Sequence, residues 1–227
     1  AHVRELRARL AEAGAVGRRF LDDAGAAPLP ALHAQIGSDA EAALRRNLAG
    51  LSEPVVHALA DALAAARRVH VFGMGGSSAV LAQELQHRLT RLGLPAAACG
   101  DAVAMRMLAA TLEPGDLVLA LSVSGRNPEL LAAAEIAAGY GAALAALTRD
   151  GTPLAARAQW LLPLSLDETD FVFKPSASRY AMLLAIDVLA TTVALRDPAG
   201  NRERLRRIKL ALDGWRGGGE DRLPLGD

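Results

Sequence analysis

From residue 69 to residue 164 the sequence alternates short apolar runs with longer amphipathic ones, and this alternation limits the fold more than any other feature. Strands that are apolar on both faces and separated by helices predict a parallel sheet with helices on both sides. We therefore expect an α/β protein, a three-layer αβα sandwich with a five-stranded parallel sheet. The expected strands are Val69 to Phe72, Ala96 to Cys99, Leu117 to Val123, Ala143 to Thr148 and Trp160 to Leu164. The helical patterns between them are at about Ser78 to Leu92, Ala102 to Leu112, Pro128 to Tyr140 and Pro153 to Ala158.

The segments on either side of this region read as helices. The first fifty residues contain no strand candidate, and their apolar residues recur at helical spacing before and after a break at Ala24 to Pro30. Ser52 has the character of an N-cap, because Glu53 and Pro54 follow it. Further helices are expected from Ala31 towards Leu51, from Ser52 to about Arg68, from Ser178 to Leu195 and from Arg202 to Leu212. We expect residues 1–50 to be a helical segment and residues 51–227 to be the α/β domain.

The composition excludes several classes of protein. Lys and Arg number 25 and so do Asp and Glu, so the chain is no polycation and any DNA contact must be local. The single cysteine, Cys99, rules out an internal disulfide framework and a Cys-based zinc cluster. The longest near-apolar stretch, Tyr180 to Leu195, is interrupted by Asp187 and falls short of the roughly 20 residues that span a bilayer. We expect a cytoplasmic protein with no membrane segment, no metal and no cofactor.

Two loops rich in glycine and serine follow the first and third expected strands. They are Gly73-Met74-Gly75-Gly76-Ser77-Ser78 and Ser122-Val123-Ser124-Gly125-Arg126-Asn127. In an open parallel sheet, ligands bind beyond the carboxyl ends of the strands, where loops lead into helix N-termini. Glycines allow close backbone approach, and serine hydroxyls with free helical N–H groups suit an anion. Because a doubly charged phosphate needs many donors and little negative charge nearby, two such loops on one sheet predict a phosphate site. The alternative is that they only form tight turns.

The loops do not match other familiar catalytic or nucleotide motifs. A dinucleotide fingerprint fails because Ser78 replaces the last glycine and no acidic residue follows about 20 positions later. A Walker A loop is excluded because no Gly-Lys-Ser/Thr follows, and a nucleophile elbow is excluded because neither serine lies in a G-x-S-x-G pattern. Glu129 lies in the first turn of the helix after Asn127, where the helix dipole favours a carboxylate. No motif places a general base among the carboxylates near the site, so no catalytic residue is assigned; they are Asp101, Glu129, Asp167, Glu168 and Asp170.

Taken together, the two loops resemble those of the SIS (sugar isomerase) domain, a phosphosugar-binding module with a flavodoxin-like fold. The resemblance covers about Leu51 to Leu195 and includes Leu147-Thr148, Ser178-Arg179 and Ile186-Asp187-Val188-Leu189. Within that superfamily the chain is most similar to RpiR-family bacterial transcriptional regulators, which join a helix-turn-helix domain to an SIS effector domain. The opening segment Val3 to Leu10 resembles the end of that DNA-binding domain. The resemblance implies that most of the helix-turn-helix domain is missing from these 227 residues.

The resemblance also implies a set of ligand contacts. It implies that the hydroxyls of Ser77, Ser122 and Ser124 contact the phosphate. Backbone groups contact it as well, at Gly75, Gly76, Val123 and Gly125. Asn127 stands where the family carries threonine, and its amide can still donate to an oxyanion and cap a helix. Ser78 is either a further contact or a surface helix residue. Asp101, Lys174 and Ser178 are the remaining candidate sugar contacts, and Asp101 is equally well explained as an exposed N-cap.

We therefore expect the effector-binding and dimerisation domain of an RpiR-type regulator that senses a sugar phosphate and controls carbohydrate-metabolism genes. A ligand that bridges the loops would favour one arrangement of the subunits, and so change how two helix-turn-helix domains meet DNA. A homodimer or homotetramer is expected. The first alternative is a sugar-phosphate isomerase or lyase of the SIS superfamily. The second is an oligomerisation unit that binds no ligand.

Overall fold

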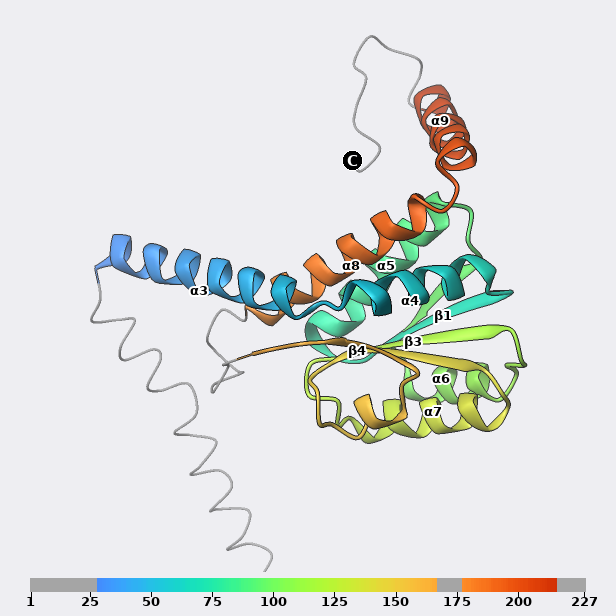
Figure 1. Ribbon diagram of the computed structural model, residues 1–227, viewed down its shortest axis with the longest axis horizontal. Helices are drawn as coiled ribbons and strands as arrows, with labels where there is room; N and C mark the ends of the chain where they lie inside the picture. Colours follow the sequence, from blue (N-terminus) through green and yellow to red (C-terminus); the bar gives the residue numbers. More distant parts are fainter. Residues whose placement is uncertain (1–27, 167–176, 216–227) are drawn as a thin grey trace, which may run out of the picture.

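Five parallel strands form one sheet at the centre of the protein (Figure 1). The structure is a computed structural model, and it describes residues 28–166 and 177–215. The strands are β1 (Arg68–Gly73), β2 (Ala96–Cys99), β3 (Asp116–Ser122), β4 (Ala143–Thr148) and β5 (Trp160–Pro163). Their order across the sheet is β2-β1-β3-β4-β5, and every neighbouring pair is parallel. All five expected strands are confirmed, and each end lies within one residue of its expected position.

Helices cover both faces of the sheet. The α-helices are α3 (Leu29–Gly50), α4 (Glu53–Ala65), α5 (Gly76–Arg91), α6 (Ala102–Ala109), α7 (Pro128–Gly139), α8 (Ser178–Ala194) and α9 (Pro198–Trp215). In Figure 1 α4, α5 and α8 lie above the sheet, and α6 and α7 lie below it. The three-layer αβα sandwich is therefore confirmed.

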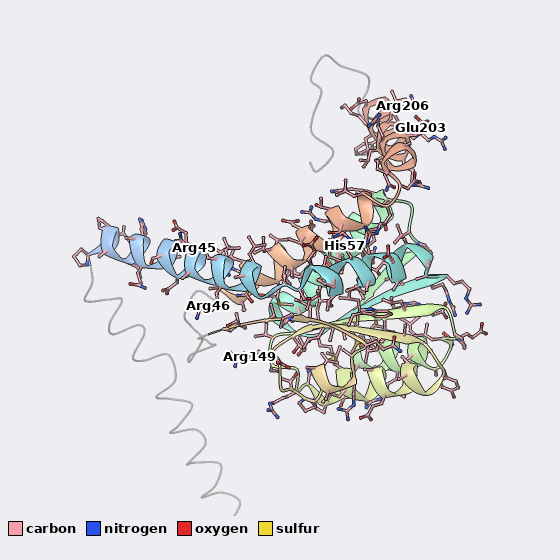
Figure 2. All side chains as sticks on the ribbon, in the orientation of Figure 1. Arg45, Arg46, His57, Arg149, Glu203 and Arg206 are labelled. Atoms are coloured by element: carbon pink, nitrogen blue, oxygen red, sulfur yellow. The ribbon has the colours of Figure 1, made fainter. Side chains whose placement is uncertain are left out.

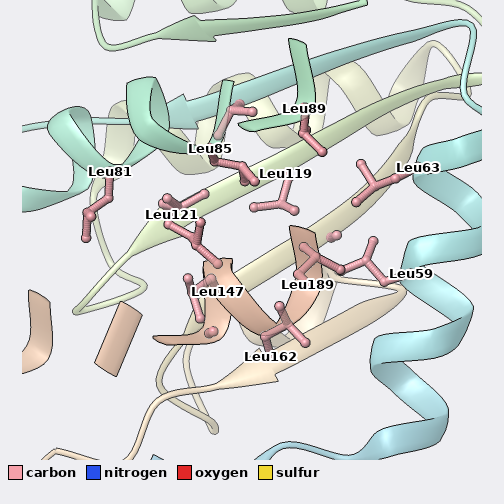
Figure 3. Close-up of a cluster of buried hydrophobic side chains, with 14 of the residues drawn as sticks. Leu59, Leu63, Leu81, Leu85, Leu89, Leu119, Leu121, Leu147, Leu162 and Leu189 are labelled. Atoms are coloured by element: carbon pink, nitrogen blue, oxygen red, sulfur yellow. The ribbon is translucent and has the colours of Figure 1, made fainter. Parts of the chain in front are cut away.

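The two faces of the strands belong to two separate apolar cores. On β3, Leu119 and Leu121 face α4, α5 and α8, whereas Val118 and Ala120 face α6 and α7. Figure 3 shows the first core, in which leucines of three helices meet those of β3, β4 and β5. Each fully buried leucine contributes about 1.5 to 3 kcal/mol relative to an exposed one. This burial on both sides explains why the strands read as continuous apolar runs instead of alternating ones.

The first and last described helices extend from the sandwich. Helix α3 runs outward at the left of Figure 1, and its inner end packs against α8. Only Ala43 and Asn47 of this helix are buried. Helix α9 turns away after α8, with a bend of 110° between the two axes. The predicted helix before α4 is thus confirmed, whereas the calls on residues 1–27, including the segment Val3 to Leu10, lie outside the described residues.

One local prediction is wrong, and a second is confirmed in position but not in its side-chain bond. The pattern from Pro153 to Ala158 forms only a three-residue 3₁₀ turn, Ala155–Arg157. Thr152 starts that turn, because its hydroxyl oxygen accepts a hydrogen bond from the Ala155 amide at 3.2 Å. Ser52 occupies the N-cap position of α4, but its side chain makes no capping hydrogen bond. The chain therefore begins α4 on the fixed geometry of Pro54 and not on a serine cap.

Within residues 28–166 and 177–215, no single helix is both long and apolar enough to cross a membrane. Helices α8 and α9 reach the required length and composition only as a pair, and that pair is sharply bent.

Candidate functional site

The two glycine- and serine-rich loops leave neighbouring strands at the same rim of the sheet. Strands β1 and β3 are paired, with Phe72 opposite Ala120 and Gly73 opposite Leu121. Paired strands lie about 4.8 Å apart, so the first loop begins beside the second. The structure therefore brings together the backbone segments that carry the proposed phosphate contacts.

The first loop is shaped by glycines. A side chain at Gly73 would collide with the backbone carbonyl of Ser78, whose carbon lies 2.9 Å from the ideal Cβ position. The loop can therefore fold back tightly only on glycine. Gly75 has φ of +64°, in the left-handed region, and it is the N-cap residue of α5. Together these residues turn the chain from β1 into α5 within two residues.

The N-terminus of α5 points its free backbone donors at this rim. The first intrahelical bond is that of Ala79, whose N–H donates to the Gly75 carbonyl. The three preceding amides of α5 have no intrahelical acceptor, no side chain of the described residues caps them, and no acidic residue stands in the first turn. Such an end carries a partial positive charge and suits an anion. Ser77 is half-buried, and Ser78 is 7% exposed, so the alternative that Ser78 is a surface helix residue is wrong.

Both serines of the second loop accept hydrogen bonds from the loop itself. The Gly125 amide donates to Ser122 Oγ at 3.0 Å, and the Arg126 amide donates to Ser124 Oγ at 3.3 Å. Ser122 is buried and Ser124 is exposed. Because each hydroxyl oxygen acts as an acceptor in these bonds, its own hydrogen remains available to an oxyanion. The bonds also fix where each hydroxyl oxygen lies.

Gly125 fits against two threonines at the end of β4. It has φ of +62°, and a Cβ there would lie 2.6 Å from Thr148 Oγ1 and closer still to Thr152 Oγ1. Thr148 stands opposite Ser122 in the β3–β4 register. Its buried hydroxyl has no hydrogen-bond partner among the described residues. The second loop is therefore packed directly onto β4, and only glycine allows this approach.

Asn127 caps α7. Its Oδ1 accepts from the amides of Glu129 and Leu130 at 3.1 and 3.0 Å, which leaves the Nδ2 group outside both bonds. Arg106 of α6 forms an ion pair with Glu129. The glutamate therefore ties two helices together, in agreement with the structural interpretation of this residue.

The remaining candidate contacts have mixed positions. Asp101 is exposed and caps α6, because its Oδ1 accepts from the Ala104 amide at 2.8 Å. Ser178 is buried at the start of α8. Lys174 lies outside the described residues, as do the acidic candidates Asp167, Glu168 and Asp170. No group of three or more His, Cys, Asp or Glu side chains in the described parts of the chain is arranged to hold a metal ion.

The most strongly perturbed carboxylate belongs to the opposite rim of the sheet. Asp116 begins β3, and its buried side chain accepts from Arg67 and Arg68 at 2.6 to 3.2 Å and from the Glu113 amide at 2.9 Å. Hydrogen bonds from the Arg68 guanidinium hold the pKa of Asp116 well below its usual range. Ligand sites of parallel sheets form at the carboxyl ends, so this network stabilises the fold and not the site.

Sequence reasoning missed a pocket beneath the inner end of α3. A cavity of about 370 Å³ lies between α3 and the carboxyl ends of β4 and β5, and its lining includes Arg46, Asn47, Arg149 and Ser165. Arg149 directly follows an expected strand, so strand-end position was an available signal for it. Asn47 lies inside a helical pattern, where nothing in the sequence marks it.

The comparisons with known proteins agree on the family. The family model described as SIS domain matches residues 62–192, which is more than half of the chain. The HTH-type transcriptional regulator HexR of Pseudomonas aeruginosa is 36% identical over 210 residues, which cover 92% of this chain and 73% of that regulator. The sugar isomerase domain of an RpiR transcription factor from Sphaerobacter thermophilus superposes with a TM-score of 0.70 at 26% identity, over 79% of this chain and 97% of that one. The Vibrio vulnificus NanR protein, solved in complex with ManNAc-6P, gives a TM-score of 0.75 at 22% identity, over 81% and 70% of the two chains.

These matches bear out the resemblance that the two loops suggested. The chain belongs to the SIS domain family and, within it, to the RpiR-type transcriptional regulators.

Proposed function

We propose that this chain is the effector-binding part of a transcriptional regulator and that it binds a sugar phosphate at the rim formed by its two loops. The observation that carries the proposal is the pairing of two preorganised serine hydroxyls with an uncapped helix N-terminus on the neighbouring strand. Family membership supports the regulatory role, and the NanR complex supports a phosphosugar as the kind of ligand.

In this proposal the phosphate accepts hydrogen bonds from Ser122, Ser124 and Ser77 and from the free amides at the start of α5. Gly75, Gly76, Val123 and Gly125 offer backbone, and Asn127 adds its Nδ2 group. The sugar then extends towards Ser78, Asp101, Lys174 and Ser178. Two of the candidate carboxylates already serve the fold, since Asp101 caps α6 and Glu129 pairs with Arg106. This supports binding without turnover, as a regulator requires.

Ligand binding would act on DNA binding by changing the arrangement of the subunits. We infer a homodimer or homotetramer in the cytoplasm, in which the whole regulator carries a helix-turn-helix domain, mostly absent from these 227 residues, ahead of α3. An effector shifts the balance between two arrangements only to the extent that it binds one of them more tightly. The two helix-turn-helix domains would then meet their operator half-sites at a different spacing.

A thermal-shift panel of sugar phosphates and the corresponding free sugars tests the proposal. At about 100 times its dissociation constant a cognate ligand stabilises the folded state by about 2.7 kcal/mol. The shift should require the phosphate group, disappear in the variant with both Ser122→Ala and Ser124→Ala, and persist in the control Ser38→Ala, an exposed serine on α3. A full shift in the double variant would place the ligand elsewhere.

The same panel separates a regulator from an isomerase. An isomerase moves a proton between adjacent carbons, so in D₂O it would exchange substrate hydrogen for deuterium at ordinary enzyme rates. We expect no exchange with the ligand that gives the largest thermal shift. Exchange that depends on the loop serines would make the chain an enzyme.

A further inference from the structure

The pocket beneath α3 is built from three separate parts of the fold. Arg46 and Asn47 come from the last turns of α3, Arg149 and Asp150 follow β4, and Leu164 and Ser165 follow β5. In Figure 2 Arg46 and Arg149 lie at the same end of the molecule, with Arg45 on the opposite side of the helix. The pocket therefore lies where the outward-running helix meets the carboxyl rim of the sheet.

The charged groups that line this pocket favour an anion. Arg46 and Arg149 supply two guanidinium groups, while Asp150, the one carboxylate among the described lining residues, accepts a hydrogen bond from the adjacent Gly151 amide at 2.7 Å. Each guanidinium carries five N–H donors, so a contact made within the protein leaves donors for a ligand. Two arginines from different elements match the planar, paired oxygens of a carboxylate or phosphate.

The α3 side of the pocket is held by a reciprocal pair of hydrogen bonds. Asn47 Nδ2 donates to the Ser165 carbonyl, and the Ser165 amide donates to Asn47 Oδ1, both at 2.9 Å. The same Nδ2 also donates to the Ala43 carbonyl at 2.8 Å. Asn47 is 3% exposed, so these bonds are shielded from water. They fix the turn of α3 that carries Arg46 relative to the end of β5.

The pocket adjoins the second serine loop but opens on the other face of the sheet from α7. Thr148 packs against Gly125 on the α7 side. Successive side chains of a strand point to opposite faces, so the next residue, Arg149, points towards α3. The two sites thus share one strand end without sharing a side chain.

We propose that the pocket is a second oxyanion site, and that an anion held between Arg46 and Arg149 fixes α3 against the sheet. The ligand class is a small molecule with a carboxylate or phosphate group. That group comes either from the far end of the compound bound at the serine loops or from a separate anion. Helix α3 connects the sheet to the N-terminal part of the chain. An anion bound at this site would therefore affect how that part is held relative to the sheet. The inference does not depend on the serine loops.

Titration with inorganic phosphate at low ionic strength tests the site. The wild-type chain should bind phosphate at two sites, and either Arg46→Gln or Arg149→Gln should weaken one of them roughly tenfold or more, as expected for loss of a charged hydrogen bond. The matched control is Arg45→Gln, because Arg45 neighbours Arg46 but pairs with Glu41 on the exposed side of the helix. Its affinities should stay within twofold of wild type.

The serine variant separates this site from the proposed phosphosugar site. The Ser122→Ala/Ser124→Ala chain should keep the arginine-dependent phosphate, and a sugar phosphate that spans both sites should lose affinity in both sets of variants. Retention of the arginine-dependent event in the serine variant shows a separate anion, whatever becomes of the proposed function. If Arg46→Gln and Arg149→Gln both bind phosphate as tightly as Arg45→Gln, the second site is refuted.

Hydrogen exchange at the Ser165 amide tests the link to α3. This amide is held by Asn47, so an anion that fixes α3 should slow its exchange at least several-fold in wild type and leave it unchanged in Arg46→Gln. An exchange rate that phosphate does not alter in the wild-type chain would show that the pocket, even when occupied, does not hold α3.

Discussion

Replacing Gly125 with alanine should be costly for two reasons that can be added. The first is the backbone: at φ of +62° an L-residue pays about 1 to 2 kcal/mol. The second is packing: the new Cβ would press on Thr148 Oγ1 at 2.6 Å and on Thr152, and crowding of a packed site costs about 1 to 3 kcal/mol. We therefore expect Gly125→Ala to lower the free energy of unfolding by about 2 to 5 kcal/mol and to abolish binding at the second loop.

Gly151→Ala is the matched control. Gly151 has φ of +65°, but nothing lies within 4 Å of its ideal Cβ position, so this variant pays only the backbone cost. Chemical denaturation of both variants isolates the packing contribution as the difference between them. If the two variants lose the same stability within about 0.5 kcal/mol, the close packing of the loop on β4 is refuted.

Three further predictions concern the cap, the opposite rim and pH. Asn127→Ala should cost about 1 kcal/mol in denaturation by removing the cap of α7, and Asn127→Thr should restore most of it; equal losses in both would contradict the cap. Asp116→Asn should cost about 2 kcal/mol at pH 7 through weakened hydrogen bonds to half-exposed arginines, with no effect on ligand affinity; a change in affinity would connect this rim to the site. Burial lowers the pKa of His70 from its ordinary 6.5, so the folded state prefers the neutral ring. Stability is then complete above pH 6.5 and falls as the pH drops towards the folded-state pKa, and His70→Gln should flatten this part of the stability curve.

The sheet was predictable because one physical signal dominates it. Strands buried on both faces must be apolar throughout, and β4, which is such a strand, could be placed without error at either end. The turn at Ala155–Arg157 was misread because proline and alanine fit a helix locally, whereas the chain forms only one 3₁₀ turn there, started by the bond from the Ala155 amide to Thr152. Local pattern does not contain that information.

The site was predictable only where chain direction determines it. Loops after parallel strands must gather at one rim, so Ser122 and Ser77 could be assigned to the same region from sequence alone. The contact of Gly125 with Thr148 depends on the β3–β4 register, and the bonds of Asn47 span 118 residues of sequence. Neither the glycine contact nor the asparagine bonds produce a periodic pattern in a single sequence, so both could be found only in the structure.

A structure of the chain bound to the sugar phosphate that gives the largest thermal shift tests the central claim most directly. The account predicts phosphate oxygens within hydrogen-bonding distance, about 2.5 to 3.2 Å, of the hydroxyls of Ser122 and Ser124 and of the amides at the start of α5. A phosphate found away from both loops, with those groups still bonded as they are here, would contradict it.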